Sequence, residues 1–376
     1  MKKSLLILTA VATVVACTKN DVINDIDTFE APIGFSKVYI EKGTKAFIYG
    51  AYDMTNFETE GNTFAVFGYK TASGTTSKVF GERSGETEGV VVKFGTDWAY
   101  TPLRYWDKAA SEYNFYAYAP SSDKFTGTVA LASNDATTFS ISDFKQNTTQ
   151  PTMIDLMTDL ESKTSVTNST TKKIGENDVV FTFKHILSNI NIFMAVSADL
   201  KSDSVNNPVT VDSVEIGAIK MDGSYAYATN KYAWTLASSA TTQTFKAQLN
   251  SNNVVFDSNE LKAISAEITG GGTLPAAVVG SDSVPLLTDL LFVPQALTAD
   301  EYVIKVKYRI KDEIFHKTIS LSSFTKKVNN VDTSLSTWEP GYKYNYVLII
   351  GPTPIYFDVA GITDWADGGT FSYTID

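Results

Sequence analysis

The sequence predicts an all-β protein made of antiparallel β-sandwiches, and three observations support that prediction. Apolar and polar residues alternate with a period of two along many short segments, which is the pattern of a half-buried strand. Clusters of Gly, Asn and Pro separate these segments, for example at 206–208, 270–272 and 340–341. Aromatic residues, which favour strands, make up 12% of the chain, and long helical periodicity is scarce. Strands that recur every 8 to 12 residues or so favour sandwiches over a βαβ arrangement.

The alternating segments cover most of the chain, in the order that a series of short strands would have. They are TFAVFGYK (63–70), YNFYAYAP (113–120), VVFTFKH (179–185), NINIFMAV (189–196), VTVDSVEIGAI (209–219), EYVIKVKYRI (301–310), FHKTISL (315–321) and YKYNYVLII (342–350).

The first 17 residues have the pattern of a secretory signal peptide. Lys2 and Lys3 precede an apolar stretch from Leu5 to Val15, and the small residue Ala16 leads into Cys17. The stretch is shorter than the roughly 20 residues that span a bilayer as a helix. We therefore expect lipidation at Cys17, with export and attachment to outer-membrane lipid; the alternative is a buried core cysteine.

The remainder of the chain is long enough for two domains. Residues 18–30 are polar and acidic and predict a flexible tether. A Ser/Thr-rich stretch without aromatic residues, 162–177, separates two series of strands. We expect an amino-terminal sandwich domain at 31–177 and a carboxy-terminal one at 178–376.

Charge and motifs argue against several classes of function. A net charge of −11 would repel a phosphate backbone, so we expect no nucleic-acid partner. The two histidines, His185 and His316, lie in alternating strands without a cysteine or carboxylate at ligand spacing. Gly270–Gly272 lacks the lysine of a phosphate-binding loop. The sequence thus predicts no enzyme, no metal site and no cofactor, and nothing favours a surface glycosidase with paired carboxylates.

Several phrases, taken in order, resemble the fimbrillin family, the subunits of type V pili from Bacteroidales. They are IGFSKVYIEKGTKA (33–46), FAVFGYK (64–70), WAYTPLRYWDKAASEYNFYAYAP (98–120), DLM (155–157), FTFKHILSNINI (181–192), FVPQ (292–295) and WEPGYKYNYVLII (338–350). The resemblance implies two transthyretin-like β-sandwich domains in tandem. It also implies assembly with other pilus subunits by strand exchange.

Strand exchange requires a removable strand, a cleavage point and a donor strand. Ile33, Phe35 and Tyr39 alternate in the candidate displaced strand. The resemblance places the proteolytic cut after Lys45, before Ala46.

The candidate donor strand is at the other end of the chain. It carries Phe371, Tyr373 and Ile375 in alternation behind Gly368 and Gly369. The alternative is an ordinary terminal strand that completes its own domain.

Three Asp-Ser-Val tripeptides resemble O-glycosylation acceptors of exported proteins in that phylum, with Ser204, Ser213 and Ser283 as candidate sites; coincidence in a Ser/Asp-rich chain is the alternative. The function we expect is a stalk, accessory or tip subunit of a cell-surface fimbrium. The alternative is a surface adhesin that binds host glycans or proteins, with exposed tryptophans as stacking residues.

Overall fold

A computed structural model describes residues 31–35, 37–40, 54–150, 152–160, 164–167, 174–176, 178–257, 260, 283–298, 301–328, 331–351, 356–362 and 369–373. Over these residues the chain is almost entirely β-structure, so the predicted all-β class is confirmed. The helical elements are short: α1 (Met54–Phe57), α2 (Ala198–Ser202) and the 3-10 turns η1 (Ser122–Lys124), η2 (Ala136–Thr138) and η3 (Leu321–Ser323).

The first half of the chain forms a nine-stranded sheet. Its main path runs β1 (Lys37–Ile40), β11 (Val180–His185), β9 (Met157–Thr158), β6 (Ala110–Ala119), β2 (Thr63–Ala72), β4 (Val90–Phe94), β5 (Trp98–Ala99). Two further strands lie off this path, β3 (Thr75–Phe80) beside β2 and β10 (Thr164–Thr167) beside β6.

Two sheets belong to the second half of the chain. The seven-stranded one runs β18 (Val284–Phe292), β12 (Ser188–Val196), β23 (Lys343–Ile350), β24 (Tyr356–Ile362), β25 (Gly369–Tyr373), β21 (Thr325–Val328), β22 (Val331–Ser334). The five-stranded one runs β16 (Thr242–Lys246), β13 (Val209–Lys220), β19 (Val303–Ile310), β20 (Glu313–Ser320), with β17 (Phe256–Asp257) beside β13.

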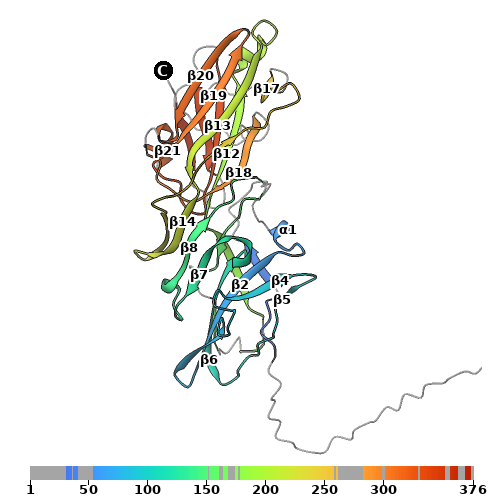
Figure 1. Cartoon of the computed structure of the whole chain (residues 1–376), viewed down its shortest axis with the longest axis vertical. Helices are drawn as coiled ribbons and strands as arrows, with labels where there is room; N and C mark the ends of the chain where they lie inside the picture. The colour runs from blue at the N-terminus through green and yellow to red at the C-terminus, as the bar shows by residue number, and fades with distance from the viewer. Residues whose placement is uncertain are drawn as a thin grey trace, which may run out of the picture.

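A four-stranded sheet combines strands from both halves. Its order is β15 (Lys231–Leu236), β14 (Asp222–Ala228), β8 (Phe139–Lys145), β7 (Thr126–Leu131), and β14 pairs antiparallel with β8. In the elongated view of Figure 1 it lies between the nine-stranded sheet and the two carboxy-terminal sheets.

Two apolar cores explain why the central strands are buried on both faces. On β2, Phe64 and Val66 face a first core, whereas Ala65, Phe67 and Tyr69 face a second. The second core continues through the four-stranded sheet to Ile350. A strand covered on both faces needs apolar residues at consecutive positions, as in β2 and in β12, where every residue is buried.

The expected domain boundary at 177–178 falls close to a change of sheet. β11 begins just after it but pairs with β9 in the nine-stranded sheet, and β12 is the first strand of the seven-stranded sheet. The chain therefore changes sheet between His185 and Ser188. The division into two transthyretin-like domains stays a prediction.

Candidate functional site

The predicted displaced strand lies between the loop at 104–106 and strand β11 of the nine-stranded sheet, and we call this place the groove. At its start it follows the loop at 104–106: the Ile33 amide donates to the Arg104 carbonyl at 2.8 Å, and the Trp106 amide to the Ala31 carbonyl at 3.0 Å. The Gly34 carbonyl then accepts from the Val179 amide at 2.8 Å. From Lys37 to Ile40 the segment pairs in parallel with β11. We call residues 31–40 the amino-terminal segment.

Four apolar side chains of this segment belong to the first core. Ile33, Phe35, Val38 and Ile40 are each 5% exposed or less. Burying side chains of this size stabilises a fold by about 1.5 to 3 kcal/mol each. The amino-terminal segment is thus an integral part of the core that it fills.

Phe35 is the centre of an aromatic pocket. Its ring lies within 5.5–6.3 Å, between centroids, of five other rings, and it stacks on Phe181 at 5.6 Å with an interplanar angle of 21°. The remaining four rings belong to Phe64, Phe80, Tyr100 and Phe115. Contacts of this kind add about 0.5 to 1.5 kcal/mol per pair beyond the area they bury.

Buried hydrogen bonds of the Tyr100 hydroxyl to Ile33 and Arg104, which we call the clip, hold the backbone of the segment where it enters the groove. The Tyr100 hydroxyl donates to the Ile33 carbonyl at 2.8 Å and accepts from the Arg104 amide at 3.1 Å. Burial raises the pKa of Tyr100, so this hydroxyl keeps its proton. Tyr100 therefore contacts the segment both through its ring and through its hydroxyl.

The Arg104 side chain fixes the position of the clip. Its guanidinium pairs with the Glu86 carboxylate at 2.5 Å, and both side chains are largely buried. It also donates to the carbonyls of Val79, at 3.1 Å, and Pro102, at 2.6 Å. These bonds orient the Arg104 backbone carbonyl toward Ile33.

The structure corrects one residue of the predicted displaced strand. Alternation placed Tyr39 on the same face as Ile33 and Phe35, but Tyr39 is 47% exposed and Val38 and Ile40 face the core. The main chain bonds to the 104–106 loop at residues 31–33 and pairs with β11 from Lys37 to Ile40, and with this change of partner the buried positions shift by one residue.

The candidate donor strand lies within the seven-stranded sheet. Phe371 and Tyr373 belong to β25, which pairs antiparallel with β24 and with β21. Its main chain is thus paired with its own chain here, as the alternative of a terminal strand describes. Ile375 lies outside the described residues, as do Cys17, Lys45, Ala46 and the 18–30 tether.

The three candidate glycosylation serines differ in accessibility. Ser213 is exposed on β13, and Ser204 is partly exposed in the turn after α2. Ser283 is 1% exposed, so the folded chain does not present its hydroxyl to a transferase.

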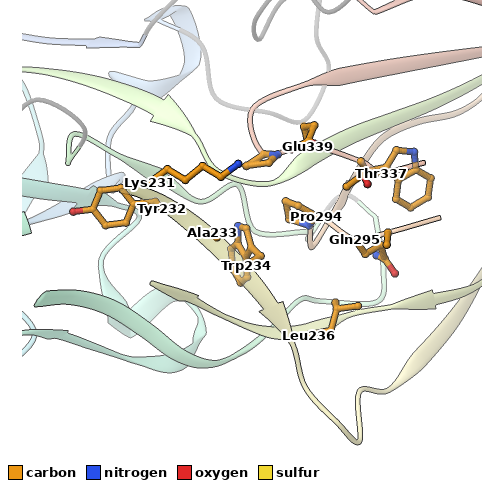
Figure 2. Close-up of a pocket in the computed structure, with 12 residues that line it drawn as sticks. Lys231, Tyr232, Ala233, Trp234, Leu236, Pro294, Gln295, Thr337 and Glu339 are labelled. Atoms are coloured by element: carbon orange, nitrogen blue, oxygen red, sulfur yellow. The ribbon is translucent and has the colours of Figure 1, made fainter. Parts of the chain in front are cut away.

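The predicted tryptophans are mostly core residues. Trp98, Trp106 and Trp338 are 8% exposed or less, Trp234 is partly buried, and Trp365 lies outside the described residues. Trp234 and Trp338 line a pocket of about 320 Å³ between β15 and the loops at 294–296 and 337–340 (Figure 2). Their ring N–H groups already donate, to the Ile186 carbonyl at 2.5 Å and to the Tyr346 hydroxyl at 2.9 Å.

Among the described residues, few side chains are arranged for catalysis or metal binding. His185 contacts the Asp155 carboxylate at 2.9 Å, and both side chains are buried. The partner lies 30 residues away, which is why spacing along the sequence did not reveal it. Within the described ranges, no three His, Cys, Asp or Glu side chains come together as a metal site.

The same ranges contain no helix with the length and apolarity to cross a membrane.

The fold and this site define an all-β protein whose first core is completed by its own amino-terminal segment. A family model described as fimbrillin-like matches residues 51–365, and this chain belongs to that family. Comparison with curated protein sequences gives no match.

Comparison with solved structures gives matches to bacterial proteins. A fimbrial protein from Bacteroides vulgatus is 19% identical, with a TM-score of 0.48, over 88% of this chain and 99% of that one. A protein classed under cell adhesion from Bacteroides uniformis is 15% identical, with a TM-score of 0.45, over 90% and 99%. The tip fimbrial protein Mfa3 from Porphyromonas gingivalis is 9% identical, with a TM-score of 0.36, over 87% and 99%.

Membership of this family supports a fimbrial protein located at the cell surface. It also confirms the resemblance noted in the sequence.

Proposed function

We propose that this chain is a structural or accessory subunit of a cell-surface pilus, assembled by β-strand donation after proteolysis between Lys45 and Ala46. The observation that supports this proposal most strongly is the insertion of the amino-terminal segment into the first core. Four buried apolar side chains and a paired main chain make this segment equivalent to a donated strand.

Removal of the segment would leave a strong driving force for its replacement. The aromatic pocket around Phe35 would lose its central ring, and the β11 edge would lose its parallel partner. An unpaired edge beside exposed apolar surface is a template for another strand. A neighbouring subunit supplies that strand in the proposed assembly.

The donor in this proposal is the carboxy-terminal strand with Phe371, Tyr373 and Ile375. Its alternating residues suit a groove that receives side chains from one face of a strand. Donation requires β25 to leave β24 and β21, and Gly368–Gly369 supplies the hinge in the sequence.

Lipid attachment at Cys17 then serves delivery. The lipid holds the subunit at the outer membrane, and cleavage after Lys45 releases the mature part together with any exposed glycans at Ser204 and Ser213. A subunit that keeps Cys17 would remain an anchor.

The test uses a full chain in which a site-specific protease sequence replaces the residues just before Ala46. After cleavage, light scattering follows the formation of oligomers, and the same chain without residues 368–376 serves as the comparison. We expect oligomers from the cut chain and none after the deletion. A cut chain that stays monomeric, with no effect of the deletion, would rule out strand donation.

A matched pair of variants tests whether the groove controls assembly. Phe35→Ala weakens the amino-terminal segment and should speed oligomer formation after cleavage, whereas Tyr39→Ala changes an exposed side chain and should not. Equal rates for the two variants would argue against release of this segment as the step that starts assembly.

The second candidate function is an adhesin for host glycans, and the pocket in Figure 2 is the observation that favours it. Aromatic rings beside an open surface can stack on sugars. Trp234→Ala should abolish binding to a glycan array, and an array on which the parent chain binds nothing would exclude this role.

A further inference from the structure

A row of buried polar side chains crosses three adjacent strands of the seven-stranded sheet. Asp289 on β18, Asn189 on β12 and Lys343 on β23 are all 7% exposed or less. The pilus function proposed above makes no use of them. Charged groups in such surroundings require paired partners or a chemical role.

Asn189 and Lys343 lie directly opposite each other. They are partners in the parallel pairing of β12 with β23, so both side chains extend from the same face of the sheet. Neighbouring strands are about 4.8 Å apart, a distance that a lysine side chain can span. The register thus places the Lys343 side chain within reach of the Asn189 amide.

The Lys343 amine has no hydrogen-bond or ion-pair partner within the described part of the chain. Burial lowers the pKa of Lys343, and the Asp289 carboxylate opposes that effect. Loss of water favours the neutral amine, which is the nucleophilic form.

Hydrogen bonds at both ends hold the Asn189 amide in place. Its nitrogen Nδ2 donates to Asp289 Oδ1 at 3.1 Å, and its oxygen Oδ1 accepts from Asn191 Nδ2 at 2.8 Å. Asn191 is itself fixed, because its Oδ1 accepts from the Asp289 backbone amide at 2.8 Å. A carboxyl group therefore contacts the nitrogen of the amide, and an N–H donor contacts its oxygen.

We propose that Lys343 and Asn189 react with each other to form an intramolecular isopeptide bond. The Lys343 Nζ attacks Asn189 Cγ, and Asn191 Nδ2 stabilises the negative charge that develops on Oδ1. Asp289 accepts a proton from the attacking amine and delivers it to Nδ2. The Cγ–Nδ2 bond breaks and ammonia leaves, so the new amide forms without an oxidant or a reductant.

The bond would tie β12 to β23, two neighbouring interior strands of the seven-stranded sheet. The chain has one cysteine in 376 residues, so a disulfide within it cannot supply a cross-link. A covalent link between neighbouring strands restricts the unfolded chain and resists extension by force.

The first test is the intact mass of the folded full chain. We expect it to be lower than the sequence mass by one molecule of ammonia, and tandem mass spectrometry of a digest should yield one branched peptide that joins Lys343 to Asn189. A chain that is purified in denaturant and has never folded should have the full mass, and it should lose ammonia only after refolding. A folded chain with the full sequence mass would overturn the proposal, and so would an ammonia loss without the branched peptide.

Variants separate the roles of the three groups. Asp289→Asn keeps the shape of the side chain but cannot relay the proton, so at least a tenfold slower loss of ammonia after refolding is expected. Lys343→Met should retain the full mass, and Lys305→Met, at an exposed lysine of β19, should lose ammonia like the parent chain. If Asp289→Asn reacts at the parent rate, Asp289 has no part in the reaction and the mechanism is wrong.

Discussion

The ring of Phe35, close to the amino terminus, stacks on the ring of Phe181, with centroids 5.6 Å apart. Phe35 belongs to the amino-terminal segment and Phe181 to β11, and we propose that assembly starts when the segment separates from this strand. Their contact links the sequence of the removable segment to the core of the first half of the chain. Loss of this contact should therefore lower the stability of the uncut protein.

Phe35→Ala should lower the free energy of unfolding by about 3 kcal/mol or more, because it leaves a cavity among five aromatic rings. The measurement is urea denaturation of the uncut chain followed by tryptophan fluorescence. Tyr39→Ala, in the same segment, should change it by less than about 0.5 kcal/mol. If both changes destabilise equally, the segment does not lie in the groove as described.

Glu86→Gln should destabilise the chain by about 3 kcal/mol, because it leaves the Arg104 guanidinium buried without a counter-charge. The same denaturation experiment measures this change. Lys70→Met breaks an ion pair with Asp107 that is more exposed and should shift stability by less than about 1 kcal/mol. A small effect at Glu86 would mean that water reaches the clip.

The Asp159 carboxyl should make stability fall as the pH rises toward neutrality. Burial raises the pKa of Asp159 to about 7, and the Thr164 hydroxyl, which donates at 3.0 Å, only partly opposes this. In the unfolded chain Asp159 has the ordinary pKa of an aspartate. Its contribution to the stability of the fold is therefore present in full below that ordinary pKa. It is lost as the pH rises through about 7.

Asp159→Asn removes this titration and should gain about 2 kcal/mol relative to the parent between about pH 5 and about pH 8. The check is urea denaturation of both chains across that range. Asp107 is the matched control, because the hydrogen bond from Lys70 lowers the pKa of Asp107. The contribution of Asp107 to stability is therefore present above its ordinary pKa and is lost as the pH falls. A parent chain and an Asp159→Asn chain with parallel pH profiles would contradict the prediction.

Alternation in the sequence was sufficient to predict the all-β class and the inward orientation of Ile33 and Phe35. It was wrong for Tyr39, because a segment that changes its pairing partner also changes the phase of its buried positions. The run Lys37-Val38-Tyr39-Ile40 contained the correct pattern, displaced by one residue.

Contacts between distant residues could not be predicted in this way. β1 pairs in parallel with β11, about 140 residues further along, and a parallel pair needs no turn signal between its strands. Likewise, β8 and β14 come from opposite sides of the expected domain boundary and form one sheet. The clip also depends on Glu86 and Arg104, which come together only through the fold.

The ends of the subunit in assembled fibres show whether the amino-terminal segment has been removed and replaced. Fibres are isolated from the surface of cells that express this chain, and the amino terminus of the subunit within them is determined by mass spectrometry. We expect a subunit that begins at Ala46 and carries no lipid. Fibres in which the subunit begins at a lipidated Cys17 and retains residues 31–40 would contradict it.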